Sequence, residues 1–180
     1  MLRAEKISNL QCPHTKMAKA EGFALITIGD ALGADECIPT KLCDQLEKST
    51  ALKDICRFDL GPHTDSLSEC LSSHKGAIII DSTQNGTAPG TVSIMDLGAM
   101  VERTTPINIR SCHGFSLADE LRATKRSGRL PKRIIFFGIE INDVEVGDKL
   151  NSKLAAKLPL LVNNLSLLMT KLLETVKKDA

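Results

Sequence analysis

The fold is decided by the stretch FALITIG at residues 23–29. It is short, apolar and rich in β-branched residues, and a glycine ends it, which is typical of a strand buried on both faces of a sheet. Two later stretches have the same character: AIII at residues 77–80 and IIFF at residues 134–137. We therefore expect three central, parallel strands.

Amphipathic stretches alternate with these apolar runs. Residues 40–48, 66–71 and 116–125 have the apolar spacing of helices. The segment TVSIM at residues 91–95 follows a Pro-Gly turn signal and predicts an edge strand that runs antiparallel. The alternation predicts an α/β fold: a three-layer sandwich with a mainly parallel, twisted sheet of about five strands and helices on both faces.

A long terminal helix is predicted by apolar residues that recur every three or four positions, namely Leu158, Leu161, Leu165, Leu168, Leu172 and Val176. Pro159 suits the first turn of such a helix. The stripe could dock a partner helix, but terminal helices more often pack on their own sheet. We expect the leucines in the core.

The chain has the size and composition of one globular domain. It has 180 residues, of which 42% are hydrophobic and 25% are charged, and one core can close around this length. Residues 1–21 have no sustained periodicity and are expected to form an N-terminal extension. Residues 22–180 are expected to form the single α/β domain.

Composition also disfavours several classes of partner. Aromatic residues make up 3% of the chain and the formal net charge is +1, so we expect no nucleic-acid partner. One basic cluster could contact an acidic or phosphate surface, but we interpret it as a solvated helix end and loop; it comprises Arg122, Lys125, Arg126, Arg129, Lys132 and Arg133.

The N-terminal residues and the cysteines indicate a compartment. Charged residues interrupt the first twenty positions, leaving no apolar stretch long enough for a signal peptide or a membrane span. We therefore expect a cytoplasmic protein without a membrane partner. The six cysteines form no CxxC pair and are expected to be reduced and mostly buried.

Polar residues at the ends of the predicted strands are the first candidates for a site, because ligands of open parallel sheets bind there. The loop GDALGADE at residues 29–36 ends in Asp35 and Glu36, which could be ligands or only favourable charges at a helix N-terminus. Asp81 ends the second apolar run. A buried acid there is costly unless it is paired, hydrogen-bonded or bound to a metal, although it could simply cap loop amides.

His113 is the third candidate. It lies just before a predicted helix with Ser116 as N-cap, and the positive end of that helix favours a neutral imidazole with a nitrogen free to ligate. Glu36, Asp81 and His113 together make a plausible site for zinc, nickel or a similar divalent ion. Cys37 and Cys112 adjoin this trio and could bring a thiol to the metal, but we expect them to be buried.

Three segments resemble the three motifs of the hydrogenase maturation endopeptidases, in order and in spacing. They are GDALGADE, DSTQNGTAPGTV at residues 81–92, and SCHGFSLADEL at residues 111–121. GIE at residues 138–140 is similar to that family's closing strand motif. The resemblance covers roughly residues 22–178, in keeping with one domain. Thr27, Asp30 and Pro39 depart from the family pattern.

The resemblance implies an endopeptidase that removes the C-terminal extension of a nickel-iron hydrogenase large-subunit precursor after nickel insertion. Glu36, Asp81 and His113 match the family's metal-binding positions and are implied as the catalytic residues. The substrate would supply the nickel, and zinc or cadmium could replace it in the free enzyme. The metal could polarise the scissile carbonyl or lower the pKa of the attacking water.

Without the resemblance, two other functions stay open. The trio could belong to a non-catalytic metal-binding assembly factor. Alternatively, the chain could be a Cys or Ser hydrolase, for which Cys112 beside His113 is the only hint, since no GxSxG elbow is present.

Overall fold

The computed structural model describes residues 22–30, 33–48, 55–62, 64–111, 117–142 and 149–178. The expected N-terminal extension at residues 1–21 therefore lies outside the described residues. Among the described helices, none combines the length and the apolar character that crossing a bilayer requires.

The described chain folds around a five-stranded sheet with the strand order β2-β1-β3-β5-β4. The strands are β1 (Phe23–Ile28), β2 (Cys56–Asp59), β3 (Gly76–Thr83), β4 (Val92–Asp96) and β5 (Arg133–Glu140). All neighbouring pairs are parallel except β4 and β5, which are antiparallel. The three apolar runs are thus the central strands, and the segment predicted at residues 91–95 is the antiparallel edge strand, as expected.

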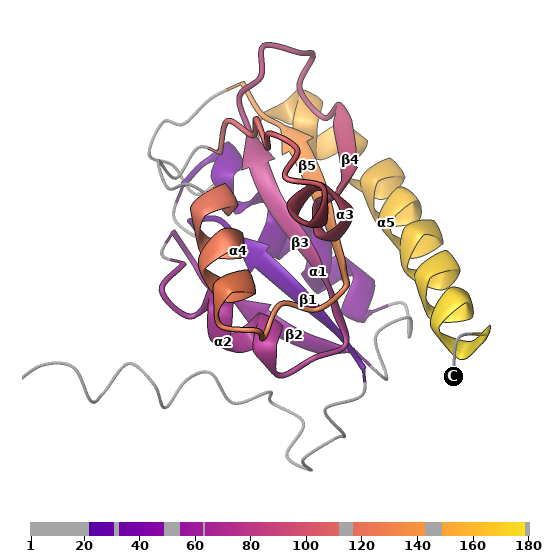
Figure 1. Cartoon of the computed structure of the whole chain (residues 1–180). Helices are drawn as coiled ribbons and strands as arrows, with labels where there is room; N and C mark the ends of the chain where they lie inside the picture. The colour runs from indigo at the N-terminus through magenta and orange to yellow at the C-terminus, as the bar shows by residue number, and fades with distance from the viewer. Residues whose placement is uncertain are drawn as a thin grey trace, which may run out of the picture.

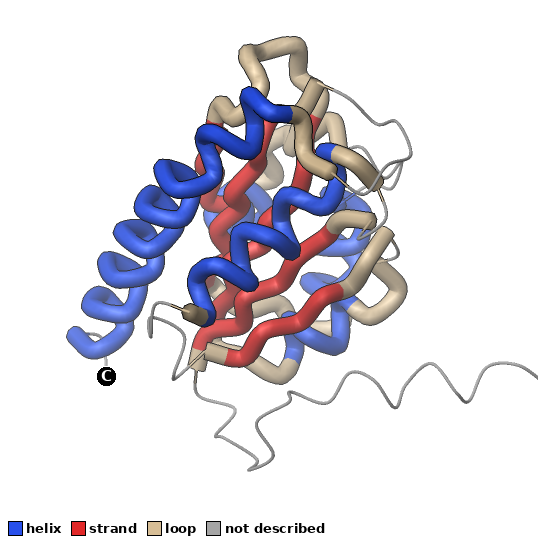
Figure 2. Tube along the Cα trace, turned by 180° about the vertical axis from the view of Figure 1, so that it is seen from behind, coloured by secondary structure: helices blue, strands red, loops and turns tan. Residues whose placement is uncertain are grey.

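Helices cover both faces of the sheet, which confirms the predicted three layers (Figures 1 and 2). One face packs against α1 (Ile38–Glu47) and α5 (Ser152–Lys178). The other packs against α2 (Leu67–Ser72), α3 (Leu97–Glu102) and α4 (Leu117–Arg126). Side chains of the central strands alternate between the two cores, because successive residues of a strand point to opposite faces.

Several boundaries differ from the sequence-based expectation. The second central strand does not end at Asp81 but continues to Thr83, because β5 runs alongside it and pairs Thr83 with Glu140. Pro159 does not lie in the first turn of α5, which begins at Ser152. Strand β2 and helix α3 were not expected, since both are too short for a clear periodicity.

The leucine stripe of α5 is largely core. Leu161 and Leu165 are 1% and 0% exposed. One predicted core position differs: Leu168 is only partly buried, and its neighbour Met169 is buried in its place. The side chain of Val176 lies outside the described residues.

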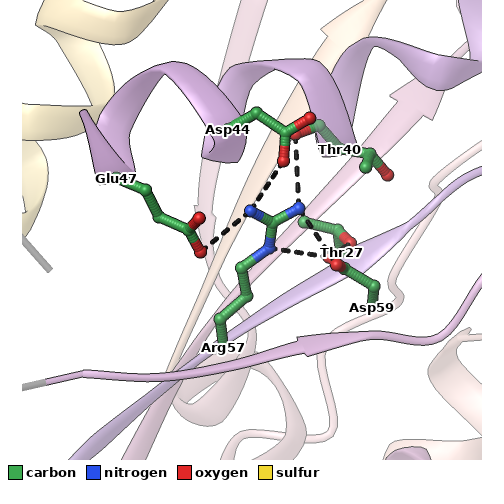
Figure 3. A network of polar contacts seen from close by, with 6 residues as sticks. All are labelled: Thr27, Thr40, Asp44, Glu47, Arg57 and Asp59. Carbon is green, nitrogen blue, oxygen red and sulfur yellow. Dashed lines mark hydrogen bonds and ion pairs between the residues drawn. The ribbon is translucent and has the colours of Figure 1, made fainter. Parts of the chain in front are cut away.

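Strand β2 is fastened to the domain by Arg57, whose side chain is 12% exposed (Figure 3). The guanidinium contacts three carboxylates, those of Asp44 at 2.8 Å, Glu47 at 3.0 Å and Asp59 at 3.0 Å. Thr27 on β1 donates its hydroxyl to Asp59 at 2.6 Å. Burial alone would lower the pKa of Arg57, but the hydrogen bonds that its guanidinium donates to Asp59 and Asp44 outweigh this effect and raise that pKa above its ordinary value. The network joins β2, β1 and α1.

Replacing Leu165 with Ala tests the core position of α5. The side chain is fully buried, so its truncation should lower the free energy of unfolding by about 2–5 kcal/mol. Leu167→Ala is the matched control, because Leu167 is 52% exposed on the same helix, and its effect should stay within about 0.5 kcal/mol. Urea unfolding followed by circular dichroism measures both; equal effects would contradict the packing.

Candidate functional site

The strand order reverses between β1 and β3. From β1 the chain passes to β2 on one side and then returns to β3 on the other side. Such a reversal is the point at which open α/β sheets bind ligands, beyond the carboxyl ends of the strands. The predicted carboxylates Glu36 and Asp81 both lie at this point.

Glu36 is held at the end of β1 by close backbone packing. It lies in the short helix η1 (Asp35–Cys37), and its carbonyl oxygen is so near Gly29 that a Cβ atom there would lie 2.5 Å away. Its carboxylate folds back over Gly33, where a Cβ atom would meet Oε2 at 2.7 Å. Two glycines of the loop are therefore needed for close approach, and the side chain of Glu36 is left partly exposed.

Asp81 lies beside the end of β1 and is fully buried. Its register partner on β1 is Ile28, the residue before Gly29. Its side chain is 0% exposed, and by strand alternation it shares the face of Ile79, on which α4 packs. A carboxylate in this position is costly to desolvate, so it is an unusual residue to find inside a buried strand.

His113 lies outside the described residues, as does Cys112. The chain on either side of it is described. Ser111 forms a β-bridge with Thr83, two positions after Asp81, and Arg110 accepts a hydrogen bond of 3.0 Å from the amide of Gln84. Within the described residues, no group of three His, Cys, Asp or Glu side chains could hold a metal ion. The structure thus places two of the three predicted ligands.

Asp35 has a different task from its neighbour Glu36. Its side chain is 0% exposed, and its Oδ1 accepts a hydrogen bond of 2.7 Å from the backbone amide of Asn151, just before α5 begins. An acid at this position favours the positive end of the helix. Asp35 therefore is a charge at a helix N-terminus, as one of the two interpretations held. The helix is α5, at the other end of the chain, and not the helix that follows Asp35 in sequence.

Cys37 is a buried thiol, as expected. It is 2% exposed and donates a hydrogen bond to the carbonyl of Ala34 at 2.9 Å. Burial raises the pKa of its thiol, and the nearby Lys41 offsets only part of that increase. A protonated thiol that already donates a hydrogen bond is a poor metal ligand, which argues against Cys37 bringing a thiol to the metal.

Glu140 is a functional candidate that sequence reasoning underrated. It is the last residue of β5 and only 3% exposed, yet its carboxylate lies under the loop that follows β3. It accepts hydrogen bonds from the amides of Gly86 at 2.6 Å and Thr87 at 3.0 Å and from the hydroxyl of Thr83 at 3.0 Å. An acid ending a buried strand was the available signal, the same signal that singled out Asp81.

The charge state of Glu140 follows from these contacts. Burial alone would raise the pKa of the carboxyl, but hydrogen bonds from the loop amides and the Thr83 hydroxyl outweigh it and lower the pKa. Its backbone joins the clamp, because its carbonyl accepts from Gly90 at 2.7 Å and its amide donates to Thr91 at 2.9 Å. Glu140 therefore fixes both ends of the loop beside Asp81.

Glu140→Gln tests this clamp through its pH dependence. A carboxyl whose pKa is lowered in the folded state stabilises that state above its unfolded pKa, and this contribution disappears as the pH falls through the folded pKa. We expect the variant to lose roughly 1–3 kcal/mol of stability at pH 7. The difference in free energy of unfolding between the variant and the natural protein should be constant above about pH 5 and should shrink below about pH 4.5. Glu174→Gln, at an exposed position of α5, should show no such difference; chemical unfolding from pH 3 to 7 measures both.

Comparison with known proteins agrees with this architecture. No curated protein sequence matches the chain. The solved hydrogenase maturating endopeptidase HybD from E. coli is similar to it, with a TM-score of 0.65 and 22% identity over 80% of this chain and 89% of that one. Two structures from Thermococcus kodakarensis have a TM-score of 0.63. The maturation protease HybD is 21% identical over 82% of this chain and 99% of its own, and HycI is 12% identical over 83% and 92%. These TM-scores show that the fold is shared.

The family itself is established by sequence. The family model described as HycI, hydrogenase maturation protease, matches residues 40–166. That segment includes Asp81 and His113 and begins just after Glu36. Since it spans more than half of the chain, the protein belongs to the hydrogenase maturation protease family, whose members are peptidases.

Proposed function

We propose that this peptidase removes the C-terminal extension of a nickel-iron hydrogenase large-subunit precursor once nickel has been inserted. In this proposal Glu36, Asp81 and His113 contact the nickel, which the precursor brings with it. The metal would help place the scissile bond and could polarise its carbonyl or activate water.

The observation that carries the proposal is the fully buried carboxylate of Asp81 at the reversal of strand order. Beside it, Glu36 is anchored over Gly29 and Gly33. Carboxylate oxygens suit a divalent ion, and a buried carboxylate is stabilised when such an ion neutralises it.

The donor set favours a metal that arrives with the substrate. The trio contains two carboxylates and one imidazole, and the neighbouring thiol of Cys37 is buried and bonded to Ala34. Without thiolates, the trio should hold a free ion modestly, whereas nickel in the precursor keeps its own sulfur ligands. In the free enzyme, the same three residues could hold zinc or cadmium in place of nickel.

The loop after Asp81 offers a surface for a protein substrate. Residues 84–88 are all exposed, although the Glu140 clamp fixes their backbone. A rigid, exposed polar loop next to the proposed nickel contacts is suited to recognising the folded precursor, because little ordering entropy is lost on binding.

Single substitutions test the three residues, two of them isosteric. Asp81→Asn, Glu36→Gln and His113→Ala should each lower the rate of precursor cleavage by about 100-fold or more, since each removes a metal contact. Asp81→Asn should leave the melting temperature unchanged or raise it, because an amide is cheaper to bury than a carboxylate. Asp65→Asn, at an exposed carboxylate, is the control. Mass spectrometry of nickel-loaded precursor measures the cleavage, and normal rates in all three variants would refute the assignment.

The source of the metal is tested by supplying it either within the precursor or as a free ion. The enzyme should not cleave nickel-free precursor even with excess zinc, and it should cleave nickel-loaded precursor without any added ion. Treating the enzyme alone with a chelator should leave the rate unchanged, because the essential metal belongs to the substrate. Cleavage of nickel-free precursor with zinc, lost after chelation, would instead indicate a conventional zinc protease.

A further inference from the structure

Within the part of the chain that the structure describes, strand β4 is an open edge of the sheet. It pairs with β5 on one side only and is the outermost strand in the order, as Figure 1 shows. All five of its residues are partly or fully exposed. Exposed edges present unpaired main-chain groups to any extended peptide.

The register indicates which main-chain groups point outward. The amide of Glu140 donates to the carbonyl of Thr91 at 2.9 Å, so this pair is hydrogen-bonded. In an antiparallel ladder, bonded and non-bonded pairs alternate. Ser93 and Met95 therefore bond to β5, whereas the N–H and C=O of Val92 and Ile94 face the open edge.

The opposite edge of the sheet is protected, which makes the open one notable. On β2, Arg57 and Asp59 place charges at the edge, and the ion-pair network locks them in place (Figure 3). Charged side chains are a common device against strand addition. The only charge on β4 is Asp96, and its carboxylate is occupied by accepting a hydrogen bond of 2.9 Å from the amide of Ala99.

The open edge carries an exposed apolar side chain, that of Ile94. The large hydrophobic residues exposed in the described chain are Ile94 on β4 and Leu160 and Leu167 on α5, at 54%, 58% and 52% exposure. Helix α5 runs alongside this side of the sheet in both views (Figures 1 and 2). Ile94 therefore offers an apolar contact to a chain that pairs along this edge.

We propose that the edge of β4 binds an extended segment of the precursor by strand addition, with an apolar side chain of that segment on Ile94. The inference rests on the proposed function, and it deepens it by naming a substrate-binding element. Strand addition holds a backbone in one register through main-chain hydrogen bonds, which a peptidase needs in order to select one bond.

The position of β4 favours the substrate as the occupant. Val92, its first residue, pairs with Ile139 beside the Glu140 clamp, at the same end of the sheet as Asp81. A peptide paired along β4 therefore has one end at the loop that follows Asp81 and the other end at the opposite side of the sheet. The edge is thus continuous with the proposed catalytic site.

Amide exchange gives a direct test with the natural protein. Residue-resolved hydrogen exchange by NMR is measured with and without nickel-loaded precursor. Exchange at Val92 and Ile94 should slow by about tenfold or more on binding, because their amides gain partners, while the amides of Ser93 and Met95 are already bonded to β5. Unchanged exchange at Val92 and Ile94 with saturating precursor would overturn the inference.

Ile94→Pro removes the outward N–H without removing a bond to β5, and proline is tolerated at such an edge position. We expect KM for the precursor to rise about tenfold with kcat within about twofold, since one binding hydrogen bond is lost. The control variant Ile94→Val keeps the N–H and an apolar side chain, so its KM should equal that of the natural protein. An unchanged KM in Ile94→Pro, with cleavage intact, would refute strand addition and leave the proposed function standing.

Two further outcomes are distinguishable. Failure of the natural protein to cleave or bind any nickel-loaded precursor would refute the proposed function and this inference together. A second outcome is that exchange at Val92 and Ile94 is already slow without precursor and slows further as the protein concentration rises. A second copy of the chain would then occupy the edge, which would overturn the inference alone.

Discussion

The burial of β1, β3 and β5 on both faces is the constraint on which the rest of the structure depends. These strands carry apolar side chains into two cores at once, so polar chemistry has room only at their ends. At the carboxyl ends the order of the strands reverses between β1 and β3, and the two described carboxylates of the predicted trio lie there. Desolvating Asp81 beside apolar residues costs free energy, which a metal or another cationic partner would offset.

The region around Asp81 is rigid because a second buried acid, Glu140, organises it. Its carboxylate accepts hydrogen bonds from the amides of Gly86 and Thr87 in the loop after β3. Its backbone forms hydrogen bonds with Gly90 and Thr91 just before β4. The same end of the sheet is tied to the terminal helix by Asp35 through the amide of Asn151. The proposed metal contacts, the exposed loop and the open edge strand therefore form one connected surface, with little conformational entropy left to lose when a protein substrate binds.

The two edges of the sheet show how the chain separates stability from binding. Thr27, which departs from the family pattern, donates to Asp59 and helps the Arg57 network to close the β2 edge (Figure 3). Pro39, another departure, lies in the first turn of α1, where proline is favoured. These substitutions thus suit local structure and leave Glu36 in place. The β4 edge has no comparable charge network, and the exposed Ile94 lies at its centre.

The sequence by itself determined the three central strands, the antiparallel edge strand, the helices on both faces and the family motifs. Those features depend on local periodicity and on composition, which one stretch of chain contains entirely. Tertiary structure alone decided the rest. Strand β2 exists because β1 supplies its pairing partner, β3 extends past Asp81 because β5 runs beside it, and Glu140 matters because folding brings a loop from residues 84–90 onto it. Each depends on contacts between residues distant in sequence, which no local pattern encodes.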